Sequence, residues 1–250
     1  MIRAEAINKS FDERKILTDI DAVFETGKVN LIIGKSGSGK TVLLKSLIGL
    51  HSIDSGKIFY DDRDFLTLKR REMKKLRNEI GVVFQGGALF DSYNVIDNVK
   101  FPLNLFTDMS EAEKDERARF CLNRVNLEDV DFFFPAEISG GMKKRVAIAR
   151  AIVLNPHYLF CDEPNSGLDP LTSIVIDNLI HEITHEYNMT TIINTHDMNS
   201  VFEIGEKIFF IHEGIKEWEG NKDTVAHTEN AHLNEFLFSS QLYQKVRRNL

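Results

Sequence analysis

The fold of this chain is decided by one stretch, Gly34-Lys35-Ser36-Gly37-Ser38-Gly39-Lys40-Thr41. It fits G-x-x-x-x-G-K-[ST], the pattern of a phosphate-binding loop (P-loop). An apolar run precedes it at residues 29–33, and apolar residues at helical spacing follow it at 42–48. Glycines let the backbone close around a phosphate, and the helix start directs N–H groups towards it. Lys40 is therefore predicted to reach the β- and γ-phosphates of a nucleotide, and the Thr41 hydroxyl to bind Mg²⁺. The alternative, a glycine-rich turn without a ligand, is disfavoured by the flanking strand and helix patterns.

Composition limits the remaining possibilities. The 250 residues are 42% hydrophobic and 28% charged, which is typical of a globular protein of one large α/β domain or a domain with a subdomain. The net charge of −7 gives no global basic field, so we expect no nucleic-acid partner. Cys121 and Cys161 have no metal-ligand spacing and are interpreted as core residues in a reducing compartment. Charges at Arg3 and Glu5 argue against a signal peptide, and no apolar run approaches the roughly 18 residues of a membrane span.

Strand and helix patterns alternate along most of the chain. Strands are predicted at residues 2–7, 16–24, 56–60, 81–84, 158–161, 190–194 and 208–211. Helices are predicted at residues 69–77, 110–126 and 142–153 and from residue 170 onwards, where Asp169-Pro170 forms a start signal. The alternation indicates a largely parallel sheet, and the opening strands indicate an added antiparallel piece.

Several polar residues follow predicted strands, at the edge of the sheet where ligands bind in α/β proteins. Asp162 is a candidate to hold Mg²⁺, and Glu163 to polarise an attacking water. Gln85 is a candidate to contact Mg²⁺ or that water, and His196 to bond a γ-phosphate. Each has an ordinary alternative: the carboxylates could form a solvated acidic turn, and most of the eight histidines are expected at the surface or satisfied.

Two further features could contact a nucleotide. Ser139-Gly140-Gly141 precedes a predicted helix and offers a hydroxyl, N–H groups and a helix dipole to an anion, unless it is a plain N-cap turn. Phe11 could stack on adenine, although an aromatic residue in a turn is more often packed locally.

A competing motif is His181-Glu182-Ile183-Thr184-His185, which matches the zinc-protease pattern H-E-x-x-H. No third ligand stands at a supporting spacing, and this helix is expected to have a polar outer face. The zinc interpretation is therefore disfavoured.

Taken together, the motifs resemble the ATP-binding subunit of an ABC transporter over nearly the whole chain. Residues 34–41 match the Walker A loop, Gln85 the Q-loop glutamine, and Ile138–Met142 the ABC signature, with isoleucine and methionine in place of the usual leucine and glutamine. The remaining matches are Tyr158–Asp162 to Walker B, Glu163 to the catalytic glutamate, Ser166–Asp169 to the D-loop, His196 to the switch histidine and Phe11 to the adenine-stacking aromatic.

This resemblance implies a fold, a site and a mechanism. The fold is an α/β P-loop NTPase with a RecA-like core (1–85 and 158–222), an N-terminal antiparallel β-subdomain and a helical subdomain (86–157), followed by a C-terminal helical tail (223–250). The implied ligands are ATP and Mg²⁺, with Thr41, Gln85 and Asp162 at the metal. The implied catalytic residues are Glu163, His196 and Gln85. The subunit is implied to work as a homodimer, in which Ser139, Gly140 and Gly141 of one copy complete the Walker A site of the other.

A narrower resemblance concerns residues 85–103 and the signature, which is similar to that of Mla-type phospholipid transport ATPases, including Met142. It implies movement of phospholipid between inner and outer membranes by a chain peripheral to the cytoplasmic face of the inner membrane. The implied partners are an integral membrane permease of the Mla type, a lipid-binding MCE-domain protein and a small STAS-domain subunit. The alternative is the ATPase of another ABC importer or of a lipoprotein-release system. A non-transport ABC ATPase is disfavoured by the single P-loop, the absence of long heptads and the acidic balance.

Overall fold

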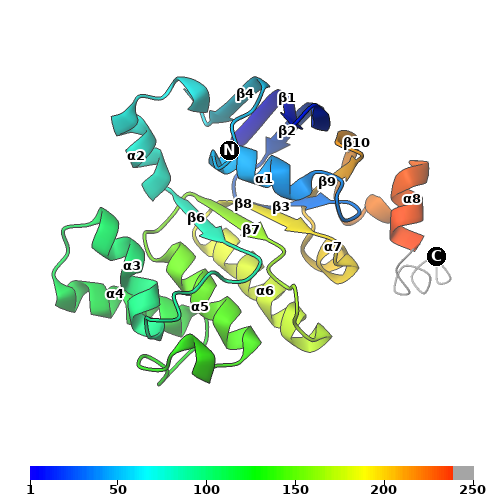
Figure 1. Cartoon of the computed structure of the whole chain (residues 1–250). Coiled ribbons are helices and arrows are strands. Elements are labelled where there is room, and N and C mark those ends of the chain that lie inside the picture. Colours follow the sequence, from blue (N-terminus) through cyan, green and yellow to red (C-terminus); the bar gives the residue numbers. More distant parts are fainter. Residues whose placement is uncertain (239–250) are drawn as a thin grey trace. The chain divides into compact units, whose positions relative to one another are not determined.

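The computed structural model describes residues 1–238, and residues 239–250 lie outside the described part (Figure 1). The chain divides into two compact units. Unit 1 consists of Met1–Met73 and Thr190–Leu250, and unit 2 of Lys74–Met189. This division by packing differs from the predicted domain boundaries at residues 85, 157 and 222, and the predicted domain organisation stays a prediction.

Unit 1 contains two groups of strands. Its strands are β1 (Ile2–Phe11), β2 (Arg14–Phe24), β3 (Lys28–Ile33), β4 (Ser55–Tyr60), β5 (Arg63–Asp64), β8 (Thr190–Thr195), β9 (Lys207–His212) and β10 (Ile215–Gly220). The antiparallel sheet has the order β2-β1-β4-β5. In the other group β3 pairs in parallel with both β8 and β9, and β10 closes the edge antiparallel to β9. The helical elements of unit 1 are α1 (Lys40–Ile48), η1 (Phe65–Thr67), α7 (Met198–Ile204), η3 (Val225–His227) and α8 (Ala231–Phe238).

The parallel register brings the ends of β3 and β8 together. Ile33 is the partner of Thr195, so the residues that follow them, Gly34 and His196, leave the sheet at the same edge. The strands are buried on both faces, as parallel strands covered by helices are: Leu31 and Ile192 have no exposed surface. The predicted P-loop and switch histidine thus start from neighbouring strands.

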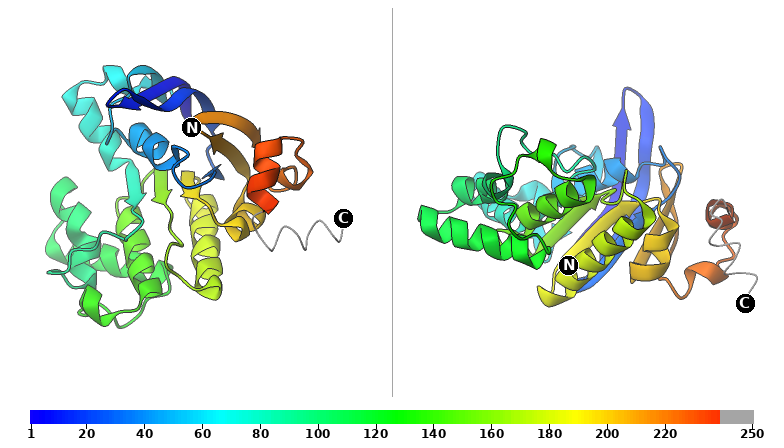
Figure 2. Two further views of the ribbon diagram at one scale, coloured as in Figure 1. Left: turned by 45° about the vertical axis from the view of Figure 1, so that its right-hand side comes forward. Right: turned by 90° about the horizontal axis from the view of Figure 1, so that it is seen from below.

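Unit 2 is mainly helical. Its elements are β6 (Ile80–Val83), α3 (Val95–Phe106), α4 (Glu111–Arg124), η2 (Pro135–Glu137), α5 (Gly140–Ile152), β7 (Tyr158–Asp162) and α6 (Pro170–Glu186), and α2 (Arg70–Asn78) contains the boundary with unit 1. Helices α3, α4 and α5 pack against one another (Figures 1 and 2), and α5 also packs on β6 and α6. β6 and β7 are parallel, with Val83 opposite Cys161, so Gln85 and Glu163 follow two paired strands.

Of the two helices that precede the signature in unit 2, α4 was predicted from the sequence and α3 was not. Helix α4 starts as expected, because Ser110 and Glu113 form a reciprocal capping box. Helix α3 was not predicted, since Pro102 interrupts its pattern; the structure shows one helix from Val95 to Phe106 that contains this proline. Asn94 caps α3, and the buried Asn98 in its second turn donates to the carbonyl oxygens of Phe90, Tyr93 and Asn94. The loop before α3 thereby holds the helix in place.

The predicted fold class is confirmed: an α/β fold with parallel strands and a separate antiparallel sheet. Within the described residues, no helix combines the length and the hydropathy that crossing a bilayer would require. Of the predicted tail, η3 and α8 are described, and residues 239–250 lie outside the described residues.

Candidate nucleotide-binding site

The loop between β3 and α1 has a backbone that only glycine fits well. Gly34 has a φ of 151°, and a Cβ on it would lie 2.2 Å from the Ile211 carbonyl oxygen of β9. Gly39, with a φ of 107°, is the N-cap of α1, and a Cβ there would lie 2.9 Å from Leu17. The loop is therefore pressed against β9 and β2, and its amide groups precede the start of α1.

Lys40 and Ser38 place two buried polar groups in this loop. Lys40 is 5% exposed, and its Nζ donates to the carbonyl oxygens of Gly34 (2.8 Å) and Lys35 (3.0 Å). The Ser38 hydroxyl is buried and has no hydrogen-bond partner among the described residues. A buried ammonium and an unpaired buried hydroxyl are costly unless a ligand uses them, so the loop fits a polyphosphate.

Thr41 has a partner that sequence reasoning missed. Its Oγ1 accepts a hydrogen bond of 2.9 Å from Nδ2 of Asn194, a fully buried residue of β8. This bond orients the hydroxyl that is predicted to bind Mg²⁺. A polar residue inside a buried strand was the available signal. His196 follows the same strand and is exposed.

A cavity of about 510 Å³ borders the loop within unit 1. Its walls are formed by residues 14–16 of β2, 35–38 of the P-loop and 212–214 at the end of β9. Arg14, Lys15 and Lys35 supply three cationic side chains, which suits an anionic ligand. Lys35 also forms a 2.7 Å ion pair with Glu235 of α8, and this pairing holds the pKa of Glu235 below its usual value.

Phe11 ends β1 and is paired with Arg14 in the register of the hairpin. The residue is 41% exposed, and its ring lies edge-on to the ring of His51, with centroids 5.3 Å apart. The Lys9 ammonium lies 5.0 Å from the centroid of the same ring. The exposure leaves ring surface for stacking, and Phe11 stays a candidate adenine contact.

In unit 2, Gln85 and Glu163 meet. The Gln85 Nε2 donates to a Glu163 carboxylate oxygen at 3.1 Å and to the Ser166 hydroxyl at 3.3 Å. Glu163 adopts a φ of 47°, which an L-residue seldom adopts, at the point where the chain leaves β7. Asp162 is the last residue of β7 and is 6% exposed. Gln85 and Glu163 are 78 positions apart in the chain and are brought together because they follow two paired strands.

Lys144 is a second residue that sequence reasoning missed. It lies on α5, is 6% exposed, and its ammonium donates to the backbone carbonyl oxygen of Gln85. Burial lowers the pKa of Lys144, while Cys161 and Glu163 act in the opposite direction. The helix that follows the signature is thereby tied to the backbone of Gln85.

The signature starts α5. Ser139 is the N-cap, its hydroxyl accepts a 3.2 Å bond from the Met142 N–H, and Ser139 and Gly140 are exposed. A Cβ on Gly141 would lie 2.8 Å from the Thr172 methyl group of α6, so a larger residue would disturb this packing. An exposed helix start of this kind can contact an anion presented by another molecule.

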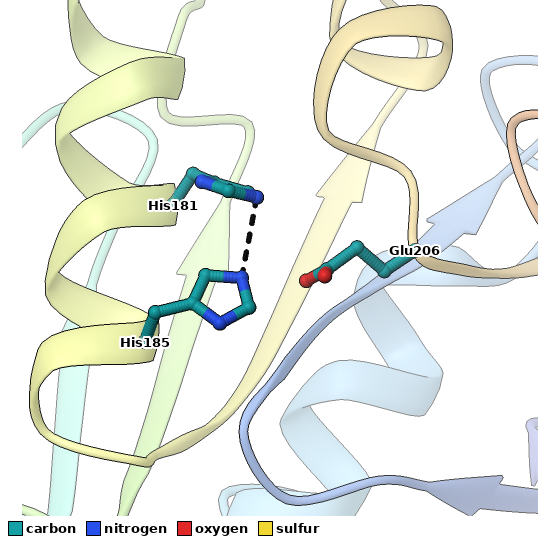
Figure 3. Close-up of side chains that lie close together, drawn as sticks. All are labelled: His181, His185 and Glu206. Atoms are coloured by element: carbon teal, nitrogen blue, oxygen red, sulfur yellow. Dashed lines mark hydrogen bonds between the residues drawn. The ribbon is translucent and has the colours of Figure 1, made fainter.

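The competing H-E-x-x-H motif lies on α6. The Nε2 atoms of His181 and His185 are 3.2 Å apart on one face of the helix (Figure 3). Glu182 instead faces Arg124 of α4, with 3.5 Å between their charged atoms. Glu206, also drawn in Figure 3, belongs to unit 1, where it accepts the Val29 N–H at 2.8 Å. The glutamate of the motif thus pairs with an arginine, which does not favour its use as a general base.

The strand, glycine loop and helix around Lys40 define the chain as a P-loop protein of the α/β class. Residues 17–166 match the family model described as ABC transporter, and the chain belongs to that family. The predicted resemblance to ABC ATP-binding subunits is confirmed at this level.

Three known proteins illustrate the relationship. The probable ribonucleotide transport ATP-binding protein mkl of Mycobacterium leprae is 41% identical over 198 residues, which are 79% of this chain and 57% of that protein. The methionine import ATP-binding protein MetN of Clostridium tetani is 40% identical over 84% of this chain and 66% of its own length. An ATP-binding cassette solved as a dimer with ADP and Pi has a TM-score of 0.80 and 31% identity, over 89% of this chain and 99% of the other. The chain thus spans little more than half of the mycobacterial relative.

Proposed function

We propose that this chain is the ATP-hydrolysing motor subunit of an ABC transporter. The observation that carries the proposal is the P-loop of unit 1, where the buried Lys40 ammonium and the unpaired Ser38 hydroxyl line a loop of crowded glycines. Catalysis of phosphoryl transfer depends mainly on positioning and on electrostatic stabilisation, and this loop supplies both.

The proposed roles follow from the chemistry of each side chain. Glu163 takes a proton from the attacking water, and Gln85 holds that carboxylate by its 3.1 Å hydrogen bond. His196 donates a hydrogen bond to the γ-phosphate. A bound Mg²⁺ would neutralise charge on the phosphate oxygens, and its proposed ligands are Thr41, Gln85 and Asp162.

A second copy of the chain is the proposed partner at the nucleotide. Ser139 and Gly140 are exposed at the start of α5, where their polar groups are available to another molecule. The related ATP-binding cassette was solved as a dimer. We propose that the signature of one copy completes the P-loop site of the other.

The second proposed partner is an integral membrane permease at the cytoplasmic face of the inner membrane. Unit 2 has a cavity of about 420 Å³ whose wall is mostly apolar, with Phe84, Phe90, Phe101 and Phe106 among its residues. Arg150 fixes one side of it by donating to the carbonyl oxygens of Gly87 and Ala88. An aromatic groove beside Gln85 suits a short helix of a membrane subunit.

The cargo has two candidates. Relatives named for ribonucleotide transport and methionine import favour a small-molecule importer. The stretch at residues 85–103 and Met142 favour phospholipid, with an MCE-domain protein and a STAS-domain subunit as further partners. We place the importer first, because sequence similarity to those relatives extends over about four fifths of the chain.

The test is phosphate release by the purified chain, alone and co-purified with its membrane subunit. We expect low activity alone, higher activity in the complex, and a loss of at least about a hundredfold in Lys40→Ala and Glu163→Gln complexes. Near-normal turnover in both variants would refute the motor function. Proteoliposomes of the complex, offered labelled methionine, a ribonucleotide or a fluorescent phospholipid, would then distinguish the cargoes.

A further inference from the structure

Three potential metal ligands come together in unit 1 from three different elements. His212 is the last residue of β9, Glu217 lies in β10, and His232 lies in the first turn of α8. Figure 2 shows α8 beside the β9–β10 hairpin. His212 borders the cavity next to the P-loop, while Glu217 and His232 have no part in the proposed nucleotide site.

The three side chains are already close. One ligand atom from each lies within 4.8 Å of the other two. Nδ1 of His232 is 2.8 Å and 3.0 Å from the two carboxylate oxygens of Glu217. The imidazole rings of His212 and His232 are nearly parallel, at 17°, with centroids 4.1 Å apart.

The Glu217 carboxylate is positioned by hydrogen bonds from more than one side. Asn230 donates to its Oε2 at 3.3 Å, which fixes the carboxylate from a second side. The carboxylate is therefore held in place by His232 and Asn230, with its two oxygens directed towards the histidine pair.

We propose that His212, Glu217 and His232 bind one divalent transition-metal ion, and that this ion fastens α8 to the β9–β10 hairpin. Two imidazole nitrogens and one carboxylate form the donor set of three-residue Zn²⁺ sites, with water in the fourth position. Zn–N bonds of roughly 2.0–2.1 Å require the ligand atoms to close in slightly. His232 has 52% of its side chain exposed, which leaves room for its ring to turn towards the ion.

The proposed metal site lies on the helix that also contacts the P-loop. Glu235, three residues after His232 on α8, forms the 2.7 Å ion pair with Lys35 of the P-loop. Holding α8 in place therefore also holds Glu235 beside the loop.

The experiment uses the full chain without nucleotide. Bound metal is first removed with a chelator, and the chain is then titrated with Zn²⁺ in competition with a chromogenic chelator. The only tryptophan, Trp218, is next to Glu217, so its emission provides a local signal. Co²⁺ serves as a second probe, because its visible absorption reports a low-coordinate nitrogen and oxygen site. The variants are His232→Gln and Glu217→Gln, with His181→Gln as the matched control at the other close histidine pair.

We expect one ion per chain, a change in Trp218 emission on binding, and at least about tenfold weaker binding in His232→Gln and Glu217→Gln. Binding by His181→Gln should equal that of the wild type. The proposal is overturned if no ion is retained, if the two site variants bind normally, or if His181→Gln also loses the ion. Because nucleotide is absent, none of these outcomes bears on the proposed ATPase.

Discussion

Replacing Gly34 by alanine tests the closeness of the P-loop to β9. The new Cβ would lie 2.2 Å from the Ile211 carbonyl oxygen and 2.8 Å from Ser38 Oγ. Gly37 offers a matched control in the same loop, because it also has a positive φ, of 79°, but a Cβ on it meets nothing within 4 Å. Both variants place an L-residue at a positive φ, and only Gly34→Ala adds a steric clash.

The magnitude follows from these distances. The Ile211 contact must open by about 0.8 Å to reach 3.0 Å, below which real Cβ atoms are essentially never found. Overpacking of this kind costs about 1–3 kcal/mol of unfolding free energy. A positive φ also costs an L-residue roughly 1–3 kcal/mol, in Gly37→Ala at 79° and at least as much in Gly34→Ala at 151°. At about 2–4 °C per kcal/mol, the two melting temperatures should differ by about 4–8 °C for a steric cost near 2 kcal/mol.

Two measurements check the prediction. Thermal unfolding followed by circular dichroism should place Gly34→Ala below Gly37→Ala by that interval. Equilibrium titration with a fluorescent ATP analogue should show at least about tenfold weaker binding in Gly34→Ala, because the Gly34 carbonyl holds Lys40 and the loop must move by nearly 1 Å. Equal melting temperatures for the two variants, or wild-type nucleotide affinity in Gly34→Ala, would refute the reasoning.

Three further predictions concern other parts of the chain. Glu163→Gln should bind the ATP analogue normally and release phosphate at least about a hundredfold more slowly, and rapid turnover would exclude Glu163 as the base. Asn194→Ala removes the 2.9 Å bond to Thr41, so half-maximal phosphate release should need roughly tenfold more Mg²⁺; an unchanged requirement would show that this bond does not orient the hydroxyl. Burial raises the pKa of the Cys121 thiol to about 11 and also raises the pKa of Cys161. At pH 8 only about one Cys121 in a thousand is then a thiolate. A thiol reagent should therefore react with both cysteines only after unfolding. Fast labelling of the native chain would contradict the burial.

Sequence reasoning predicted the local conformation of two contiguous segments. The loop around Lys40 is set by eight adjacent residues, and the cap at Ser139 by the residues that follow it. It failed for α3, because the proline rule is local and Asn98, which fixes that helix, acts through the preceding loop. It also missed Lys144, because a lysine in a polar helical stretch gives no sign that it is buried against the Gln85 carbonyl.

Comparison with relatives confirmed the ABC transporter family and the α/β fold. The relatives carry the names of ribonucleotide and methionine transporters, and the phospholipid cargo stays a proposal. Cargo is hard to predict from this chain because the nucleotide loop is shared by all cassettes. In the proposed complex, the groove beside Gln85 contacts a membrane subunit, and only that subunit contacts the cargo.

The sequence by itself determined the glycine loop, its phosphate chemistry, most of the order of strands and helices, and the family. The tertiary structure decided which distant side chains meet. Asn194 bonds Thr41 across 153 residues, and Glu235 pairs with Lys35 across 200 residues. The register between parallel strands and the packing of α8 set these pairs, and neither leaves a local pattern. The same holds for His212, Glu217 and His232, because three elements must first fold together before the side chains offer one site.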